Sequence, residues 1–216
     1  MIPINRSDFV CKTIPMETDM FASYAIAEYT LAIEPPAALV EKIKAVKKQF
    51  AEKYDCPSAL KSRSQIVLIR FQQYEMLERK ILHRLQVQAA AQHSFIVELT
   101  DFESLPTHSI FIHIRTKTQI TELVKSFRPM QQLLKIDKER KPHFITDPHI
   151  NIAVKLLPWQ YEKGWLELSN THFSGRFVAE QLVLLRRRAG EGRYETLKKF
   201  QLLNDRITIT QGALFT

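Results

Sequence analysis

The chain has 216 residues, of which 45% are hydrophobic and 25% are charged. This balance is typical of an ordinary folded domain, and it excludes a fibrous or low-complexity protein. The length is sufficient for one large domain or two closely associated lobes. No stretch approaches the ~20 consecutive apolar residues of a membrane-spanning helix.

The net charge of +8 comes from 31 Lys and Arg against 23 Asp and Glu. This excess favours anionic partners such as RNA, nucleotides or phosphate esters, although many basic domains bind no nucleic acid. The two cysteines, Cys11 and Cys56, make no disulfide framework and have no metal-ligand spacing. They indicate a reducing, cytoplasmic setting, and we expect no signal peptide, no metal and no cofactor.

The first half of the chain predicts two helices between three strands. Residues 1–22 are expected to form an N-terminal arm, and residues 23–216 a single domain. A strand ends before the prolines at 35 and 36, and is followed by a helix with apolar residues at helical spacing and lysines on its other faces (Leu39, Ile43, Val46 and Phe50; Lys42, Lys44, Lys47 and Lys48). A strand near 64–70, a helix over 77–85 and a strand over 95–99 follow.

The second half repeats this order. We expect a strand over 109–115, a helix over 120–127, a charged connection over 137–147, a strand near 148–155 and a short helix over 161–168. One or two strands follow over 173–185. The tail predicts a helix over 193–203 and a strand over 206–210.

Two short segments in matching places look like copies of one motif. Pro148-His149-Ile150-Asn151 has an upstream echo in Ser64-Gln65-Ile66-Val67, and 149 minus 65 places them 84 residues apart. In each, the second and fourth residues share one face of a strand. The order strand, helix, motif strand, helix, strand in both halves predicts an α+β fold. We expect it to be bilobal, with two pseudo-symmetric lobes of mainly antiparallel sheet, helices outside and a central cleft.

Over residues 24–203 this arrangement resembles the two-histidine (2H) phosphoesterase superfamily, which includes 2'-5' RNA ligase-like proteins and cyclic phosphodiesterases. The resemblance rests on the order of elements, the motif spacing, Phe144 shortly before Pro148-His149, and Gly192-Arg193-Tyr194 before Phe200-Gln201-Leu202. Members carry two His-x-Thr/Ser motifs. The resemblance implies that two histidines act as general base and general acid on a phosphodiester, while the hydroxyls hold the phosphoryl oxygens.

Carried over to this chain, the resemblance makes His149 the catalytic histidine of the second motif. Asn151 replaces the second hydroxyl residue and keeps a hydrogen-bond donor. In the first motif Gln65 replaces the histidine and Val67 the threonine, so neither position can move a proton. Losing one general acid or base typically lowers the rate by roughly 10²–10⁴-fold.

Further candidates for substrate binding are His113 and Arg115, on a strand expected beside the second motif, and Lys155, expected on the His149 face. Each has an ordinary alternative: His113 as a hydrogen-bonded sheet residue, the other two as solvated charges. The run Arg186-Arg187-Arg188, followed by Ala-Gly-Glu-Gly, predicts a basic flexible loop that could hold a nucleic-acid backbone.

These observations predict a protein that binds a phosphorylated nucleotide or an RNA end near His149, Asn151 and Gln65, with impaired or unconventional phosphodiester hydrolysis. The alternatives are a non-catalytic module that binds RNA or another anion, and a vestigial cleft with a role in protein interaction. The sequence leaves the substrate and the oligomeric state open.

Overall fold

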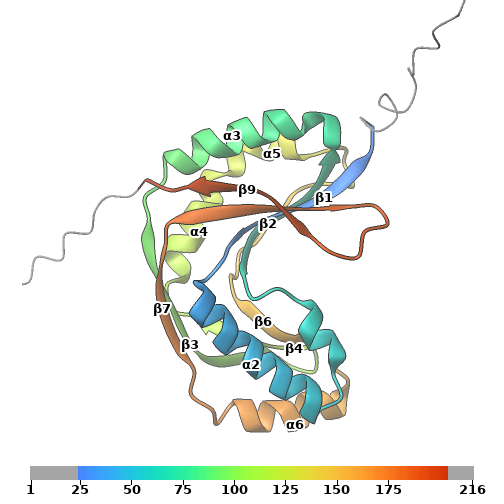
Figure 1. Cartoon of the computed structure of the whole chain (residues 1–216), viewed down its shortest axis with the longest axis vertical. Helices are drawn as coiled ribbons and strands as arrows, with labels where there is room; N and C mark the ends of the chain where they lie inside the picture. The colour runs from blue at the N-terminus through green and yellow to red at the C-terminus, as the bar shows by residue number, and fades with distance from the viewer. Residues whose placement is uncertain (1–23, 204–216) are drawn as a thin grey trace, which may run out of the picture.

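The computed structural model describes residues 24–203, so the predicted arm over 1–22, Cys11 and the predicted strand over 206–210 lie outside the described residues. Two antiparallel sheets form the framework (Figure 1). The first sheet has the order β5-β2-β1-β8-β9 and the second the order β6-β4-β3-β7. The predicted α+β fold with two sheets and surrounding helices is confirmed.

The strands of the first sheet are β1 (Ile26–Ile33), β2 (Ile66–Tyr74), β5 (His143–Phe144), β8 (Gln181–Arg188) and β9 (Glu195–Gln201). Those of the second sheet are β3 (Phe95–Leu105), β4 (Ser109–Ile114), β6 (Ile150–Val154) and β7 (Ser174–Ala179). Each motif strand pairs with the first strand of its own half, β2 with β1 and β6 with β4. Each central strand then pairs with a strand of the other half, β1 with β8 and β4 with β3, so the halves interleave.

The main helices are α2 (Ala37–Lys53), α3 (Glu78–Ala90), α4 (Lys117–Ser126), α5 (Gln131–Leu134) and α6 (Pro158–Leu168), with 3-10 turns η1 (Pro57–Lys61), η2 (Glu75–Leu77) and η3 (Arg128–Met130). The helix α2 follows β1 of the first sheet but contacts β6 of the second, whereas α4 follows β4 of the second sheet but contacts β2 of the first (Figure 1). Each sheet is thus contacted by a helix that follows a strand of the other sheet.

Alternation along the strands separates a packed face from a second face in each sheet. In the first sheet the ring of Tyr29 stacks on that of Phe71, with centroids 5.1 Å apart, and Leu31 pairs with Ile69. In the second sheet Ile110, Ile112 and their neighbours join the same continuous core. Close approach of α6 to α2 depends on Gly164, where a Cβ would overlap the Phe50 ring. The other faces of the sheets carry the motif residues.

Three sequence expectations need correction. Residues 193–203 contain the strand β9, because Leu197 and Phe200 pack beside β8 rather than on a helix. The charged connection over 137–147 contains β5, which pairs with β2. Lys47 lies in the buried stripe of α2, between Ile43 and Phe50, instead of on a solvent face. In the described part of the chain no helix has the length and apolarity needed to cross a membrane.

Candidate functional site

The second motif lies at the start of the edge strand β6, with His149 directly before the strand and Asn151 on it. Pro148 and Ile150 are buried while His149 and Asn151 are half-buried, so the two polar side chains share a face. The His149 ring lies against the Phe111 ring, with centroids 4.4 Å apart and planes 35° apart. Phe111 is the register partner of Asn151 on β4, which explains how the two strands build one surface.

A backbone contact fixes the orientation of the His149 imidazole. Its Nδ1 lies 2.9 Å from the carbonyl oxygen of Asp147. Because a carbonyl oxygen only accepts, Nδ1–H is the donor, and Nε2 of the neutral ring keeps its lone pair. Nε2 can therefore accept a proton or a hydrogen bond, and the protonated ring can give one back.

A chain of charged side chains runs beside this histidine. Lys117 Nζ lies 2.8 Å from Asp147 Oδ1 and 3.9 Å from Glu103 Oε2. His113 Nδ1 lies 2.8 Å from Glu103 Oε1, a contact that becomes an ion pair when the imidazole is protonated. The strand β4, which carries His113, pairs with β6 of the second motif as expected, and the Glu103 carboxylate lies close to His113 Nδ1 without hydrogen-bond geometry. A role for His113 in substrate binding stays a prediction.

Two other predicted binding residues follow strands instead of lying on them. Arg115 comes directly after β4 and is exposed. Lys155 comes directly after β6, is exposed and has a φ of 55°. A bulge at Ile152 in the pairing with β4 also interrupts the alternation of β6. Lys155 therefore lies beyond the strand on which it was expected, and the substrate-binding roles of Lys155 and Arg115 stay predictions.

The first motif occupies the matching place in the other sheet. Val67 pairs with Ala32 of β1, and buried Ile66 and Leu68 alternate with half-buried Gln65 and Val67. The Gln65 Oε1 atom is shielded from solvent and has no hydrogen-bond partner among the described residues. This position keeps the strand geometry while offering an amide and a methyl group where the 2H pattern has an imidazole and a hydroxyl.

The segment before the second motif is hydrogen-bonded to the first motif strand. Phe144 pairs with Ile69 of β2, and the Ile145 N–H donates to the Leu68 carbonyl over 2.9 Å. His149 follows Ile145 by four residues, which span at most about 14 Å of extended chain. The two motifs are thus joined through a short, anchored stretch of backbone.

A groove of about 1060 Å³ lies beside the first motif. Its walls come from α2, from the segment that leads into β2, and from residues near the β7–β8 connection and on β9, and its lining includes Gln65 but not His149. Its basic side chains outnumber its acidic ones: Lys44, Lys47, Lys48, Lys61, Arg63 and Lys199 against Glu34, Glu41, Glu52 and Glu180. Sequence reasoning missed this groove because the lysines of α2 are equally typical of a face exposed to solvent.

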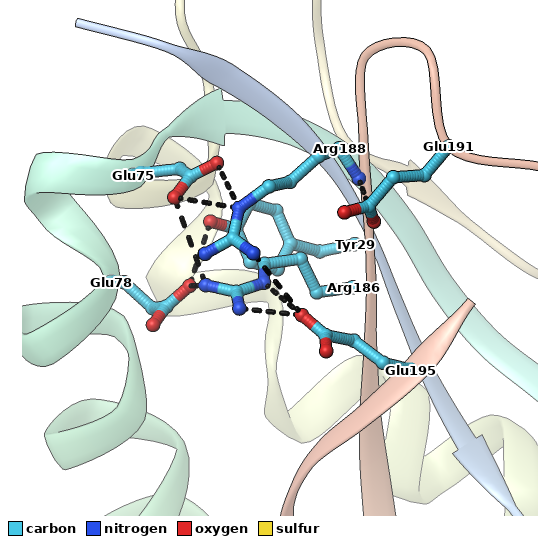
Figure 2. Close-up of polar contacts among 7 residues, drawn as sticks. All are labelled: Tyr29, Glu75, Glu78, Arg186, Arg188, Glu191 and Glu195. Atoms are coloured by element: carbon cyan, nitrogen blue, oxygen red, sulfur yellow. Dashed lines mark hydrogen bonds and ion pairs between the residues drawn. The ribbon is translucent and has the colours of Figure 1, made fainter. Parts of the chain in front are cut away.

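The three consecutive arginines do not form a loop. They end the strand β8, where Arg186 and Arg188 share one face and Arg187 points to the other. Figure 2 shows Arg186 between Glu78 and Glu195, with Nη1–Oε2 and Nη2–Oε1 distances of 2.8 and 2.5 Å, and Arg188 beside Glu75. The predicted flexible, nucleic-acid-holding loop is therefore wrong for these residues, because carboxylates of the same chain hold their guanidinium groups.

On the opposite face Arg187 binds Glu28 and stacks on Tyr194, with the guanidinium carbon 4.8 Å from the ring centroid. Burial by itself would raise the pKa of Glu28, but hydrogen bonds from Arg187 and Tyr194 hold that pKa below its ordinary value. Burial and the same carboxylate raise the pKa of Tyr194. This trio is a closed ion-pair network rather than an open cationic patch.

No group of three or more His, Cys, Asp or Glu side chains placed to hold a metal occurs within residues 24–203. The described cysteine, Cys56, is buried and free. The second motif and its neighbours thus supply an imidazole, an amide and the Lys117–Asp147 ion pair. This set suits hydrogen bonding to an anion and proton transfer at one position.

Comparison with solved structures places the chain in a known fold. The crystal structure of E. coli LigT in apo form matches with a TM-score of 0.53 and 17% identity, over 82% of this chain and 98% of LigT. A structure of a Thermus thermophilus protein matches with a TM-score of 0.54 and 18% identity, over 82% of this chain and 99% of that one. A structure described as a phosphoesterase matches with a TM-score of 0.52 and 17% identity, over 82% and 98%. No protein-family model matches, and no curated protein is detectably similar in sequence.

These likenesses confirm the fold that the paired motifs predicted. The chain has the LigT-like arrangement of two antiparallel sheets with helices, and the match extends over nearly the whole of the solved proteins. At 17–18% identity the comparisons speak for the fold alone.

Proposed function

We propose that the protein binds a phosphorylated nucleotide or an RNA end at His149 and Asn151, and that its phosphodiester hydrolysis is impaired or unconventional. The observation that carries the proposal is the position of His149 directly before the edge strand β6 of a LigT-like fold, with Asn151 on that strand. The proposed ligand class is supported by structures of E. coli LigT complexed with 3'-AMP, with ATP and with phosphate.

The geometry of the second motif suits phosphate recognition. The backbone contact of the His149 ring involves Nδ1 and leaves Nε2 free. When the ring is protonated, Nε2 can therefore donate a hydrogen bond to a phosphate oxygen. The Asn151 amide adds a second donor on the same face. Both side chains are half-buried, which strengthens their hydrogen bonds relative to fully hydrated groups.

The first motif is the reason to expect impairment. In-line displacement at phosphorus needs proton transfer on opposite sides, and Gln65 and Val67 supply neither an acid nor a base. A turnover roughly 10²–10⁴-fold below that of a two-histidine site follows from the loss of one such group. The same observation supports the alternative of a non-catalytic module for RNA or another anion.

The test combines a binding and a turnover assay. Calorimetric titration with 3'-AMP should give measurable affinity, and His149→Ala should weaken it about tenfold, the loss of one charge-assisted hydrogen bond. His83→Ala, an exposed histidine of α3, is the matched control and should leave the affinity unchanged. Equal affinities for the wild type and both variants would refute the placement at His149.

The turnover assay uses 2',3'-cyclic AMP. We expect weak or no hydrolysis by the wild type and a gain with Gln65→His combined with Val67→Thr. Fast wild-type turnover that His149→Ala abolishes would contradict the proposed impairment. Binding of 3'-AMP without a gain from the double variant would favour the non-catalytic alternative.

A further inference from the structure

Lys47 is a cation in the buried stripe of α2. It follows Ile43 by four residues and precedes Phe50 by three, and both neighbours are buried. The residue is 2% exposed, although a lysine is almost never fully buried without a partner. Burying a charge opposes folding, so an apolar residue at this position of α2 would oppose folding less than a lysine does.

The ammonium group of Lys47 is held by neutral oxygens alone. Its Nζ donates to the carbonyl oxygen and to the hydroxyl of Ser62, each over 2.9 Å. No carboxylate of residues 24–203 lies within ion-pair distance of it. Burial lowers the pKa of Lys47 to about 8, so the amine is still mainly charged at neutral pH. Its location joins α2 to the segment that leads into the first motif strand.

The groove beside this lysine has more positive than negative charge. Three of its carboxylates have cationic partners: Glu41 with Lys44 at 2.8 Å, Glu52 with Lys48 at 3.8 Å, and Glu34 with Arg63 at 3.6 Å. Within the described residues Lys47, Lys61 and Lys199 have no ion pair, and a single further carboxylate, Glu180, lines the groove. Three unpaired cations and one unpaired carboxylate leave a surplus of two positive charges in the groove.

Gln65 contributes to the groove an amide oxygen that needs a hydrogen-bond donor. Its Oε1 is shielded from solvent and has no hydrogen-bond partner among the described residues, so it can accept from a ligand hydroxyl or amine. A ligand that satisfies this groove therefore carries both an anionic group and a hydrogen-bond donor. A sugar phosphate unit, with its phosphate oxygens and ribose hydroxyls, combines the two.

We propose that this groove is a phosphate-binding subsite for a nucleotide, in which Lys47 and Lys199 face the phosphate and Gln65 accepts from the sugar. The inference deepens the proposed function and rests on it for the ligand class, and it adds residues of the groove to the phosphate contacts proposed for His149 and Asn151. When the ligand binds, a phosphate oxygen takes the place of the water that the Lys47 ammonium group lost on burial. The first motif position thus serves binding in place of proton transfer.

The experiment is a calorimetric titration of the full-length protein with 3'-AMP, and with adenosine as the ligand without a charge, at pH 7 and low salt. Lys47→Met keeps an unbranched apolar side chain and removes the ammonium group with its charge. Lys42→Met makes the same change on an exposed face of α2, outside the groove, and is the matched control. Lys199→Gln is a second groove variant at an exposed position, where folding is not at risk.

We expect Lys47→Met to weaken 3'-AMP binding by about tenfold or more, the size of one charge-assisted hydrogen bond. Lys199→Gln should weaken it roughly threefold, as for one exposed charge contact. Lys42→Met should leave it unchanged, and adenosine should bind none of the proteins. Wild-type affinity should also fall as the pH rises through about 8, where Lys47 loses its proton, and this step should be absent from Lys47→Met.

Each outcome separates the inference from the proposed function. If Lys47→Met and Lys199→Gln bind 3'-AMP like the wild type while His149→Ala is weakened, the inference falls and the proposed function stands. If the two lysine variants are weakened and His149→Ala is not, the inference stands and the placement at His149 falls. If the wild type binds no 3'-AMP, both are refuted.

Discussion

Replacing Arg186 by methionine should destabilise the fold more than replacing any other arginine of the triplet. The Arg186 side chain is 11% exposed and contacts three carboxylates, those of Glu75, Glu78 and Glu195 (Figure 2). Glu75 and Glu78 are themselves 18% exposed. Removal of the guanidinium leaves these carboxylates close together with little hydration, and the Tyr29 hydroxyl would still donate to Glu78.

The expected loss is about 2–3 kcal/mol of unfolding free energy. Breaking a fully buried pair costs about 3–5 kcal/mol, and the partial exposure of this network reduces that figure. For a chain of this size such a loss lowers the melting temperature by about 4–12 °C. Arg188→Met is the control, because Arg188 is 44% exposed and its carboxylate partners Glu75 and Glu195 keep their contacts with Arg186. It should lose less than about 1 kcal/mol.

Urea unfolding at pH 7, followed by circular dichroism, measures both losses. Acid provides a second readout: the hydrogen bond from Arg186 lowers the pKa of Glu195, so its stabilising effect is present above the ordinary carboxylate pKa and is lost as pH falls through the lowered value. The difference between wild type and Arg186→Met should therefore shrink in acid. Equal losses for Arg186→Met and Arg188→Met at pH 7 would refute this account of the cluster.

Three further changes test other parts of the structure. Gly164→Ala should cost about 1–3 kcal/mol in urea unfolding, because its Cβ would overlap the Phe50 ring; a neutral effect would mean that α6 shifts freely. Phe111→Leu should weaken 3'-AMP binding roughly threefold by removing the ring that supports His149, and unchanged affinity would deny that support. The stability of the wild type relative to Lys47→Met should fall by up to about 1.4 kcal/mol per pH unit as pH drops from 10 to 8, because the unfolded lysine then binds more protons than the folded one; a flat difference between pH 8 and 10 in urea unfolding would contradict the buried position of its charge.

The sequence predicts the framework of the site well because strand alternation survives the loss of chemistry. Buried Ile66 and Leu68 keep Gln65 and Val67 on one face, as Pro148 and Ile150 do for the second motif. This alternation and the repeat were sufficient to predict that the two motif strands lie in two different sheets. What could be predicted is therefore local: which residues share a face.

The errors arise where two periodicities fit the same residues. Tyr194, Leu197 and Phe200 recur at spacings of three, which is compatible with a helix, but a β-bulge at Leu197 lets Leu197 and Phe200 lie along the strand β9. Lys47 also fits the apolar stripe of α2 by spacing, and its charge alone argued for a solvent face. In both cases tertiary packing decided between patterns that the sequence leaves equivalent.

The exchange of helices between the sheets ties the two halves of the chain into one folding unit. Because α2 follows β1 but contacts β6, and α4 follows β4 but contacts β2, a fragment cut between the halves would leave each apolar helix face without its sheet. The contacts that complete either sheet are distant in sequence, so folding must close long loops before it gains them. Neither half can be removed without exposing the core of the other, which is a physical reason for the first motif strand to persist even where its side chains move no proton.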